Sequence, residues 1–162
     1  MRGSFLPSDY DGESVTVQHE EVNQILSNCT AKNKLVIADA CHSGSYVASK
    51  SIESARQALE DGGQLYEELN KTQPGTAYLL SSLADEESLE VSSLQNSVFT
   101  YFILRGLKGE ANKNNDNIVT IKELFDFVSV NVASYAKSLG KKQTPILKGD
   151  FDPEMPVAIV RK

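Results

Sequence analysis

Residues 34–44 of this 162-residue chain read KLVIADACHSG, and this stretch decides the fold. The apolar run at 35–38 predicts a buried strand of the kind found in parallel sheets that are covered on both faces. The run stops at Asp39, and Cys41 follows ahead of a flexible Ser-Gly pair. Ligands of open α/β sheets bind at the carboxyl ends of the strands, so Cys41 is a candidate nucleophile.

Strand and helix patterns alternate along the rest of the chain. Apolar runs at 77–80 and 157–160 predict two further strands, and apolar faces predict helices over 22–29, 97–107 and 121–139. This alternation predicts a single α/β domain over residues 1–162, in which a mostly parallel sheet is flanked by helices. Segment 45–76 is polar, and we expect it to form the crossover between two parallel strands.

The charge and composition argue against several classes of partner. A net charge of −6 speaks against nucleic acid, which requires a basic face, and mildly favours a basic substrate. The apolar runs fall well short of the roughly 20 residues that span a membrane, and no secretory signal pattern is present. We therefore expect neither a nucleic-acid nor a membrane partner.

The two cysteines of the chain are too few for a disulfide framework. Cys29 continues the apolar helical face formed by Val22, Ile25 and Leu26, so we expect it to lie in the core. This usage of cysteine favours a reduced protein in the cytoplasm.

The hexapeptide DACHSG at 39–44 resembles the nucleophile motif of the caspase-like cysteine peptidases of family C14, specifically the metacaspase and orthocaspase branch. Caspases proper carry a Gln-Ala-Cys-x-Gly version of the motif. The segments FLPSDYDG at 5–12, FTY at 99–101 and GLKG at 106–109 are also similar to the family, so the resemblance covers most of the chain. It implies a three-layer caspase-like fold and a cysteine-type endopeptidase.

The resemblance also implies roles for individual residues. The Cys41 thiolate would attack the peptide carbonyl, and its own backbone N–H would help to bind the oxyanion. Asp39 lies on the same side of the strand as Cys41, because side chains alternate. In the metacaspase-like branch this acid lines the pocket for Arg or Lys before the scissile bond, which makes a peptide or protein with a basic residue the expected substrate. The strand at 77–80 would run into a substrate-binding loop at Ser81 and Ser82. Segment 45–76 would correspond to the connection that some members of the family cut during activation, and a passive surface connection is the alternative.

The catalytic base is missing from the motif pattern. In caspases the histidine lies about 50 residues upstream of the cysteine, whereas Cys41 has only 40 residues before it and the family's Ser-Gly-His-Gly signature does not occur in the 162 residues. His42 adjoins Cys41 and should point away from it, and His19 falls on a different helix. We expect the chain to begin downstream of the histidine motif, so that another segment or a second chain supplies the histidine and the N-terminal strands. The alternative is a histidine-less pseudo-enzyme or interaction module of the same fold.

Residues 112–123, NKNNDNIVTIKE, have the spacing of an EF-hand calcium loop. Asn112 stands where the loop requires Asp, Asn117 stands where it requires Gly, and only two carboxylates remain. An Asn-rich turn followed by a capping box of Thr120 and Glu123 explains the same residues. Calcium-dependent metacaspases also use an acidic residue soon after the nucleophile, and residues 45–50 contain none. We therefore expect no metal and no cofactor, and a calcium-responsive interaction domain is a third alternative.

Overall fold

The computed structural model describes residues 4–5, 17–39, 74–83, 86 and 88–160. Its central sheet contains three strands, β3 (Lys34–Ala38), β4 (Thr76–Leu80) and β8 (Ile146–Asp150), in the order β3-β4-β8. The β3–β4 pair is parallel and the β4–β8 pair is antiparallel, so the described sheet is mixed. The strands expected at 35–38 and 77–80 are thereby confirmed, and so is the α/β class.

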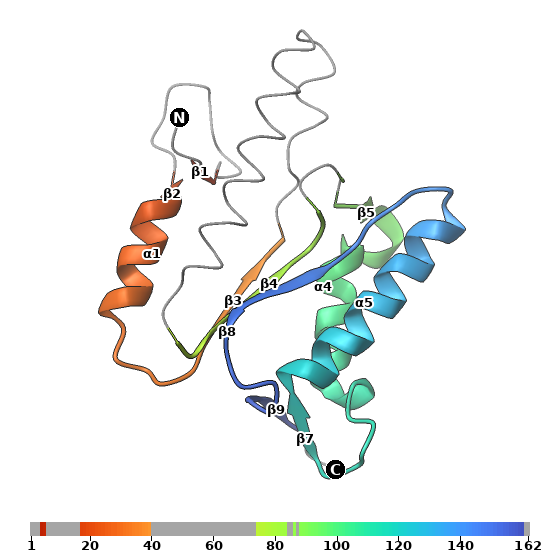
Figure 1. The fold of residues 1–162 in the computed structure, drawn as a ribbon. Coiled ribbons are helices and arrows are strands. Elements are labelled where there is room, and N and C mark those ends of the chain that lie inside the picture. Colours follow the sequence, from red (N-terminus) through yellow and green to blue (C-terminus); the bar gives the residue numbers. More distant parts are fainter. Residues whose placement is uncertain (1–3, 6–16, 40–73, 84–85, 87, 161–162) are drawn as a thin grey trace, which may run out of the picture.

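Helices cover both faces of this sheet, as Figure 1 shows for α1 (His19–Asn28) on one side and α4 (Val98–Arg105) and α5 (Ile121–Ser138) on the other. Side chains of β4 alternate between the two faces. Tyr78 and Leu80 pack with Leu26 of α1, while Leu79 joins the larger core beneath α4 and α5. This arrangement gives the expected three layers, with β4 buried along its whole length.

The α4–α5 layer supplies most of the core. Four residues of α4 are buried, and α5 buries one side chain at nearly every turn: Val98, Phe99, Phe102, Ile103, Ile121, Leu124, Val128, Val132 and Ala136. A π-helical turn, η2 (Gly106–Glu110), extends α4. The spacing in α5 is the helical periodicity read from the sequence, and burial of that stripe explains why the helix forms there.

The remaining strands form three small two-stranded units. They are the antiparallel pairs β1 (Ser4–Phe5) with β2 (Val17–Gln18), β5 (Glu90–Val91) with β6 (Asn96–Ser97), and β7 (Ile118–Thr120) with β9 (Pro156–Ile159). A 3₁₀ turn, η1 (Ser92–Leu94), joins β5 to β6. The strand expected at 157–160 is present as β9, but it pairs with β7 outside the central sheet.

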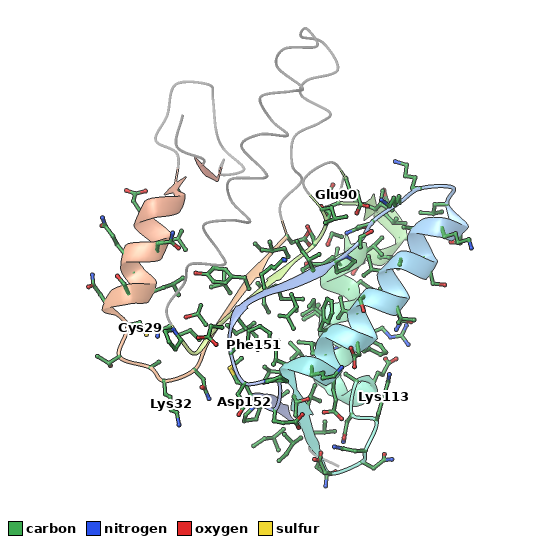
Figure 2. The ribbon with its side chains drawn as sticks, in the orientation of Figure 1. Cys29, Lys32, Glu90, Lys113, Phe151 and Asp152 are labelled. Carbon is green, nitrogen blue, oxygen red and sulfur yellow. The ribbon has the colours of Figure 1, made fainter. Side chains whose placement is uncertain are left out.

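The prediction that Cys29 lies in the core is wrong. Helix α1 ends at Asn28, and Cys29 follows it as an exposed residue (Figure 2). Its N–H donates to the carbonyl of Leu26 at 3.3 Å, which closes the helix end. Because the chain leaves the helix one residue early, Cys29 does not continue the apolar stripe, and Ile25 on that stripe is itself exposed.

No helix in the described part of the chain is both long enough and apolar enough to cross a membrane. The crossover proposed for 45–76 lies outside the described residues as far as residue 73, and its end enters β4.

Candidate active site

The candidate site begins at Asp39, directly after the carboxyl end of β3. Cys41 and His42 lie outside the described residues, so the roles of the Cys41 thiol and backbone N–H stay predictions. Asp39 is exposed. The base of the site is fixed by the sheet, because Ser81 N donates to the Ala38 carbonyl at 3.0 Å and joins the ends of β3 and β4.

Three hydroxyl groups hold the Asp39 carboxylate. Ser88 Oγ donates to Oδ1 at 2.8 Å, Thr100 Oγ1 donates to Oδ2 at 2.6 Å, and Ser97 Oγ also donates to Oδ2. We call Ser88, Ser97 and Thr100 the hydroxyl cluster. A carboxylate can only accept, so each hydroxyl must direct its proton at Asp39. Among the described residues no Lys or Arg forms an ion pair with this carboxylate. Within that part of the chain, no opposite charge therefore balances the carboxylate.

Helix α4 positions two members of the hydroxyl cluster. Ser97 is its N-cap, and Ser97 Oγ accepts the Thr100 N–H at 3.0 Å while donating to Asp39. An N-cap oxygen satisfies one of the free N–H groups of the first turn, which is why serine is favoured there. Val98 and Phe99, between the two hydroxyl residues, are buried and anchor the turn to the core. The first turn of α4 thus fixes the position of the Asp39 carboxylate.

Gln143 holds the third member of the cluster. It lies between α5 and β8 and is 1% exposed. Its Nε2 donates to Ser81 O at 3.0 Å and to Ser88 Oγ at 3.3 Å, and its Oε1 accepts the Leu89 N–H at 3.1 Å. A carbonyl can only accept and a backbone N–H can only donate, so these partners fix the orientation of the amide. Because Ser88 accepts from Gln143, its own proton is directed to Asp39.

Glu86 makes a second link between the β4–β5 loop (residues 81–89) and the segment at 142–144. Its side chain is 4% exposed, and it accepts from Thr144 N at 2.6 Å and Thr144 Oγ1 at 2.9 Å. Lys142 Nζ lies 2.9 Å from Glu86 Oε1. Burial acts to raise the pKa of Glu86, but the hydrogen bonds from Lys142 and Thr144 outweigh it and hold the pKa below its usual value of 4.5. Glu86 is therefore charged at neutral pH and fixes the loop.

Comparison with known proteins identifies the family. A family model described as the caspase domain, of peptidase family C14, matches residues 3–153. This chain belongs to the caspase domain family. The comparisons with curated proteins and with solved structures gave no match. Membership agrees with the α/β layers described above, and it supports the general class that the sequence predicted, a caspase-like cysteine peptidase.

Within the caspase domain, Ser81 and Ser82 lie at the end of β4 and are both buried. The Ser81 carbonyl accepts from Gln143, and Ser82 Oγ donates to the Glu86 carbonyl at 3.3 Å. These bonds stabilise the start of the β4–β5 loop. Contact between either serine and a substrate stays a prediction.

Sequence reasoning missed the hydroxyl cluster and the three residues of 142–144, which all contact the β4–β5 loop. Ser97 directly before an apolar run is an N-cap signal and predicts where α4 starts. It does not predict that both hydroxyls meet Asp39, which precedes them by 58 and 61 residues. Gln143 has no local signal at all, because its partners lie 54 to 62 residues earlier.

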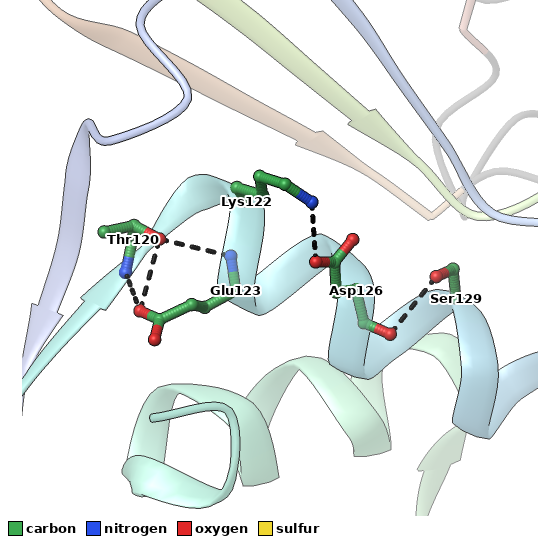
Figure 3. Close-up of polar contacts among 5 residues, drawn as sticks. All are labelled: Thr120, Lys122, Glu123, Asp126 and Ser129. Carbon is green, nitrogen blue, oxygen red and sulfur yellow. Dashed lines mark hydrogen bonds and ion pairs between the residues drawn. The ribbon is translucent and has the colours of Figure 1, made fainter. Parts of the chain in front are cut away.

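The loop at 112–123 forms the predicted capping box (Figure 3). Glu123 N donates to Thr120 Oγ1 at 3.2 Å, and Thr120 N donates to Glu123 Oε2 at 3.0 Å. Asp116 Oδ1 accepts Ile118 N at 2.8 Å. Both carboxylates of the loop are thus engaged in local hydrogen bonds. Nowhere in the described ranges do three or more His, Cys, Asp or Glu gather as metal ligands.

Proposed function

We propose that this caspase domain is part of a cysteine endopeptidase that cleaves after Arg or Lys. Asp39 receives the basic side chain, and the Cys41 thiolate attacks the carbonyl that follows it. The observation that carries the proposal is the Asp39 carboxylate, which is exposed at the carboxyl end of β3 and bound by three neutral hydroxyl groups.

The chemistry of that carboxylate favours a cationic ligand. Hydroxyl donors orient a carboxylate but do not neutralise it, so the charge remains available to a ligand. A guanidinium or ammonium group brings both the opposite charge and N–H donors. An acidic side chain would instead meet like charge, which argues against cleavage after Asp. The net charge of −6 adds a weaker, long-range preference for basic substrates.

Catalysis requires a base, and the family's Ser-Gly-His-Gly signature, which carries the histidine base, does not occur in the 162 residues. A free thiol is only slightly ionised near neutral pH and needs a partner base. We propose that a histidine outside these residues, in a further segment or a second chain, takes the proton of Cys41. The Cys41 N–H then contributes to the oxyanion site for the reacting carbonyl.

The test is covalent labelling of Cys41 with peptidyl acyloxymethyl ketones that differ only in the residue before the electrophile. Once a histidine-bearing segment of the family is supplied to the chain, Arg and Lys peptides should label Cys41, as mapped by mass spectrometry, whereas an Asp peptide should not. Asp39→Asn should abolish the preference, and Cys41→Ala should abolish the label. Equal labelling by the Asp and Arg peptides would refute the basic pocket.

The absence of the histidine signature also favours a second candidate, a caspase-like interaction module without turnover. The two candidates differ once a histidine-bearing segment of the family is supplied to the chain. Peptidase activity after Arg that depends on Cys41 supports the enzyme. Binding of basic peptides without cleavage, under the same conditions, supports the module.

We further propose that the reaction uses no metal or cofactor and that the protein works in the reducing cytoplasm. The two carboxylates of the 112–123 loop are already engaged by Ile118 N and by the capping box, which supports the first point. Calorimetric titration with calcium should give no binding heat. Saturable heat that disappears in Asp116→Asn would contradict it.

A further inference from the structure

The two oxygens of Asp39 differ in how many hydrogen bonds they accept. Oδ1 accepts one, from Ser88 Oγ, and Oδ2 accepts two, from Ser97 Oγ and Thr100 Oγ1. Each carboxylate oxygen offers about two acceptor positions. Counted over the described residues, Oδ2 is therefore saturated, while Oδ1 keeps one open position.

This asymmetry affects arginine and lysine differently. A guanidinium binds a carboxylate best as a fork, with one N–H on each oxygen, whereas an ammonium is a point charge that one oxygen can satisfy. With Oδ2 saturated, arginine can form the fork only by displacing a hydroxyl. It is left with a single hydrogen bond to Oδ1, as lysine is.

We propose that Thr100 is a specificity-determining residue, which by saturating Oδ2 removes the advantage that arginine would otherwise have over lysine. This inference rests on the proposed function of Asp39 as the site for the basic side chain. The structure places Thr100 in the first turn of α4, partly exposed and next to the exposed carboxylate, where a ligand can approach it.

Thr100 is the member of the hydroxyl cluster that can be removed most cleanly. Ser97 also caps α4, so its loss would disturb the helix. Ser88 bonds the other oxygen and is held by Gln143. The Thr100 hydroxyl makes its hydrogen bond to Asp39, and its backbone N–H, which bonds the cap, survives substitution.

The experiment measures binding and does not depend on the chemistry of Cys41. The ¹⁵N-labelled chain is titrated with two acetylated tripeptide amides that differ only in the last residue, Arg or Lys, and NMR shifts give both dissociation constants. For the wild type, the dissociation constant of the Lys peptide divided by that of the Arg peptide should be near one. In Thr100→Ala the vacated position lets arginine form the fork, and the ratio should rise about fivefold, the equivalent of about 1 kcal/mol for one exposed charged hydrogen bond.

Two variants control for the loss of a hydrogen bond as such. Thr100→Val removes the same bond but fills the position with a methyl group, so its ratio should stay near that of the wild type. Ser88→Ala frees a position on Oδ1 and leaves Oδ2 saturated, so its ratio should also stay near that value. Urea unfolding of each variant checks that it is folded before the titration is interpreted.

The outcomes separate this inference from the proposed function. If Asp39→Asn loses both peptides and Thr100→Ala keeps the wild-type ratio, the role of Thr100 is refuted and the basic pocket stands. If Asp39→Asn binds both peptides as well as the wild type does, or if the wild type binds neither, the basic pocket is refuted and the role of Thr100 falls with it. If the ratio of dissociation constants rises as much in Thr100→Val as in Thr100→Ala, the proposed role of the Thr100 hydroxyl is also refuted.

Discussion

Replacing Glu86 by Gln tests whether a buried charge fixes the loop beside the candidate site. Glu86→Gln keeps the shape of the side chain but removes its charge. Gln can still accept Thr144 N on its oxygen, and the Thr144 hydroxyl can rotate to accept from the new amide group. Both hydrogen bonds to Thr144 can therefore form in the variant, but as neutral bonds.

The magnitude follows from the difference between charged and neutral hydrogen bonds. A hydrogen bond to a charged group contributes about 1.5–3 kcal/mol, and a neutral one contributes about 1 kcal/mol. Two such exchanges at Thr144 cost about 2 kcal/mol. The ion pair with Lys142 adds less than about 1 kcal/mol, because the Lys142 side chain is 74% exposed. The bonds to Thr144, rather than the ion pair, should dominate, so Lys142→Met should cost much less than Glu86→Gln.

The assay is urea unfolding at a series of pH values. The pKa of Glu86 in the folded protein lies below its usual value of 4.5. Its stabilisation is therefore fully present above that value and is lost as the pH falls through the lower, folded-state pKa. The difference in unfolding free energy between wild type and Glu86→Gln should be constant from pH 7 to about pH 5 and should shrink under more acidic conditions.

Exposed Glu154 provides a matched control, and Glu154→Gln should change stability by less than about 0.5 kcal/mol. The reasoning fails if Glu86→Gln costs no more than this control at pH 7. It also fails if the deficit of Glu86→Gln persists unchanged in acid.

Four further substitutions test the fold. Gly149→Ala should cost at least about 3 kcal/mol in thermal unfolding, because φ is +111° and a Cβ would lie 2.1 Å from a β4 carbonyl oxygen. Gly140→Ala is the control, because φ is +68° there and nothing lies within 4 Å of the added Cβ, and it should cost about 1 kcal/mol. Equal costs for the two variants would contradict the clash at Gly149. Cys29→Ser should change stability by less than about 0.5 kcal/mol, and Cys29 should react rapidly with Ellman's reagent in the folded protein; slow reaction would mean that it is covered. Thr120→Ala should cost about 1 kcal/mol in urea unfolding through the lost cap of α5, and no loss would refute the capping box.

Local patterns predicted several elements of the fold but not β8, the third strand of the central sheet. The apolar run before Asp39 became β3, the periodic stripe from Ile121 became α5, and the Thr120–Glu123 spacing became a capping box. Each depends on neighbours a few residues apart, which a single sequence displays. Cys29 shows the limit of such reasoning, because the periodicity continues past the residue at which the helix ends.

The surroundings of Asp39 could not be predicted in the same way. The motif identified the carboxylate, but its hydroxyl donors come from a loop and a helix that the sheet brings together only on folding. Serine and threonine are common in loops and at caps, so nothing in their local sequence marks them as partners of a distant acid. Prediction of such contacts needs the strand order and the crossing of α4 over the sheet.

The buried amide of Gln143 has a consequence for how the domain tolerates change. All of its hydrogen bonds are made to the end of β4 and the β4–β5 loop, although it belongs to the connection that leads from α5 into β8. An insertion or deletion in that connection would withdraw the amide from Ser88 and release a hydroxyl that orients Asp39. Under the proposed function, a change of length in this connection would thus alter the selectivity at Asp39, and engineering of this domain should keep the spacing between Gly140 and Gln143.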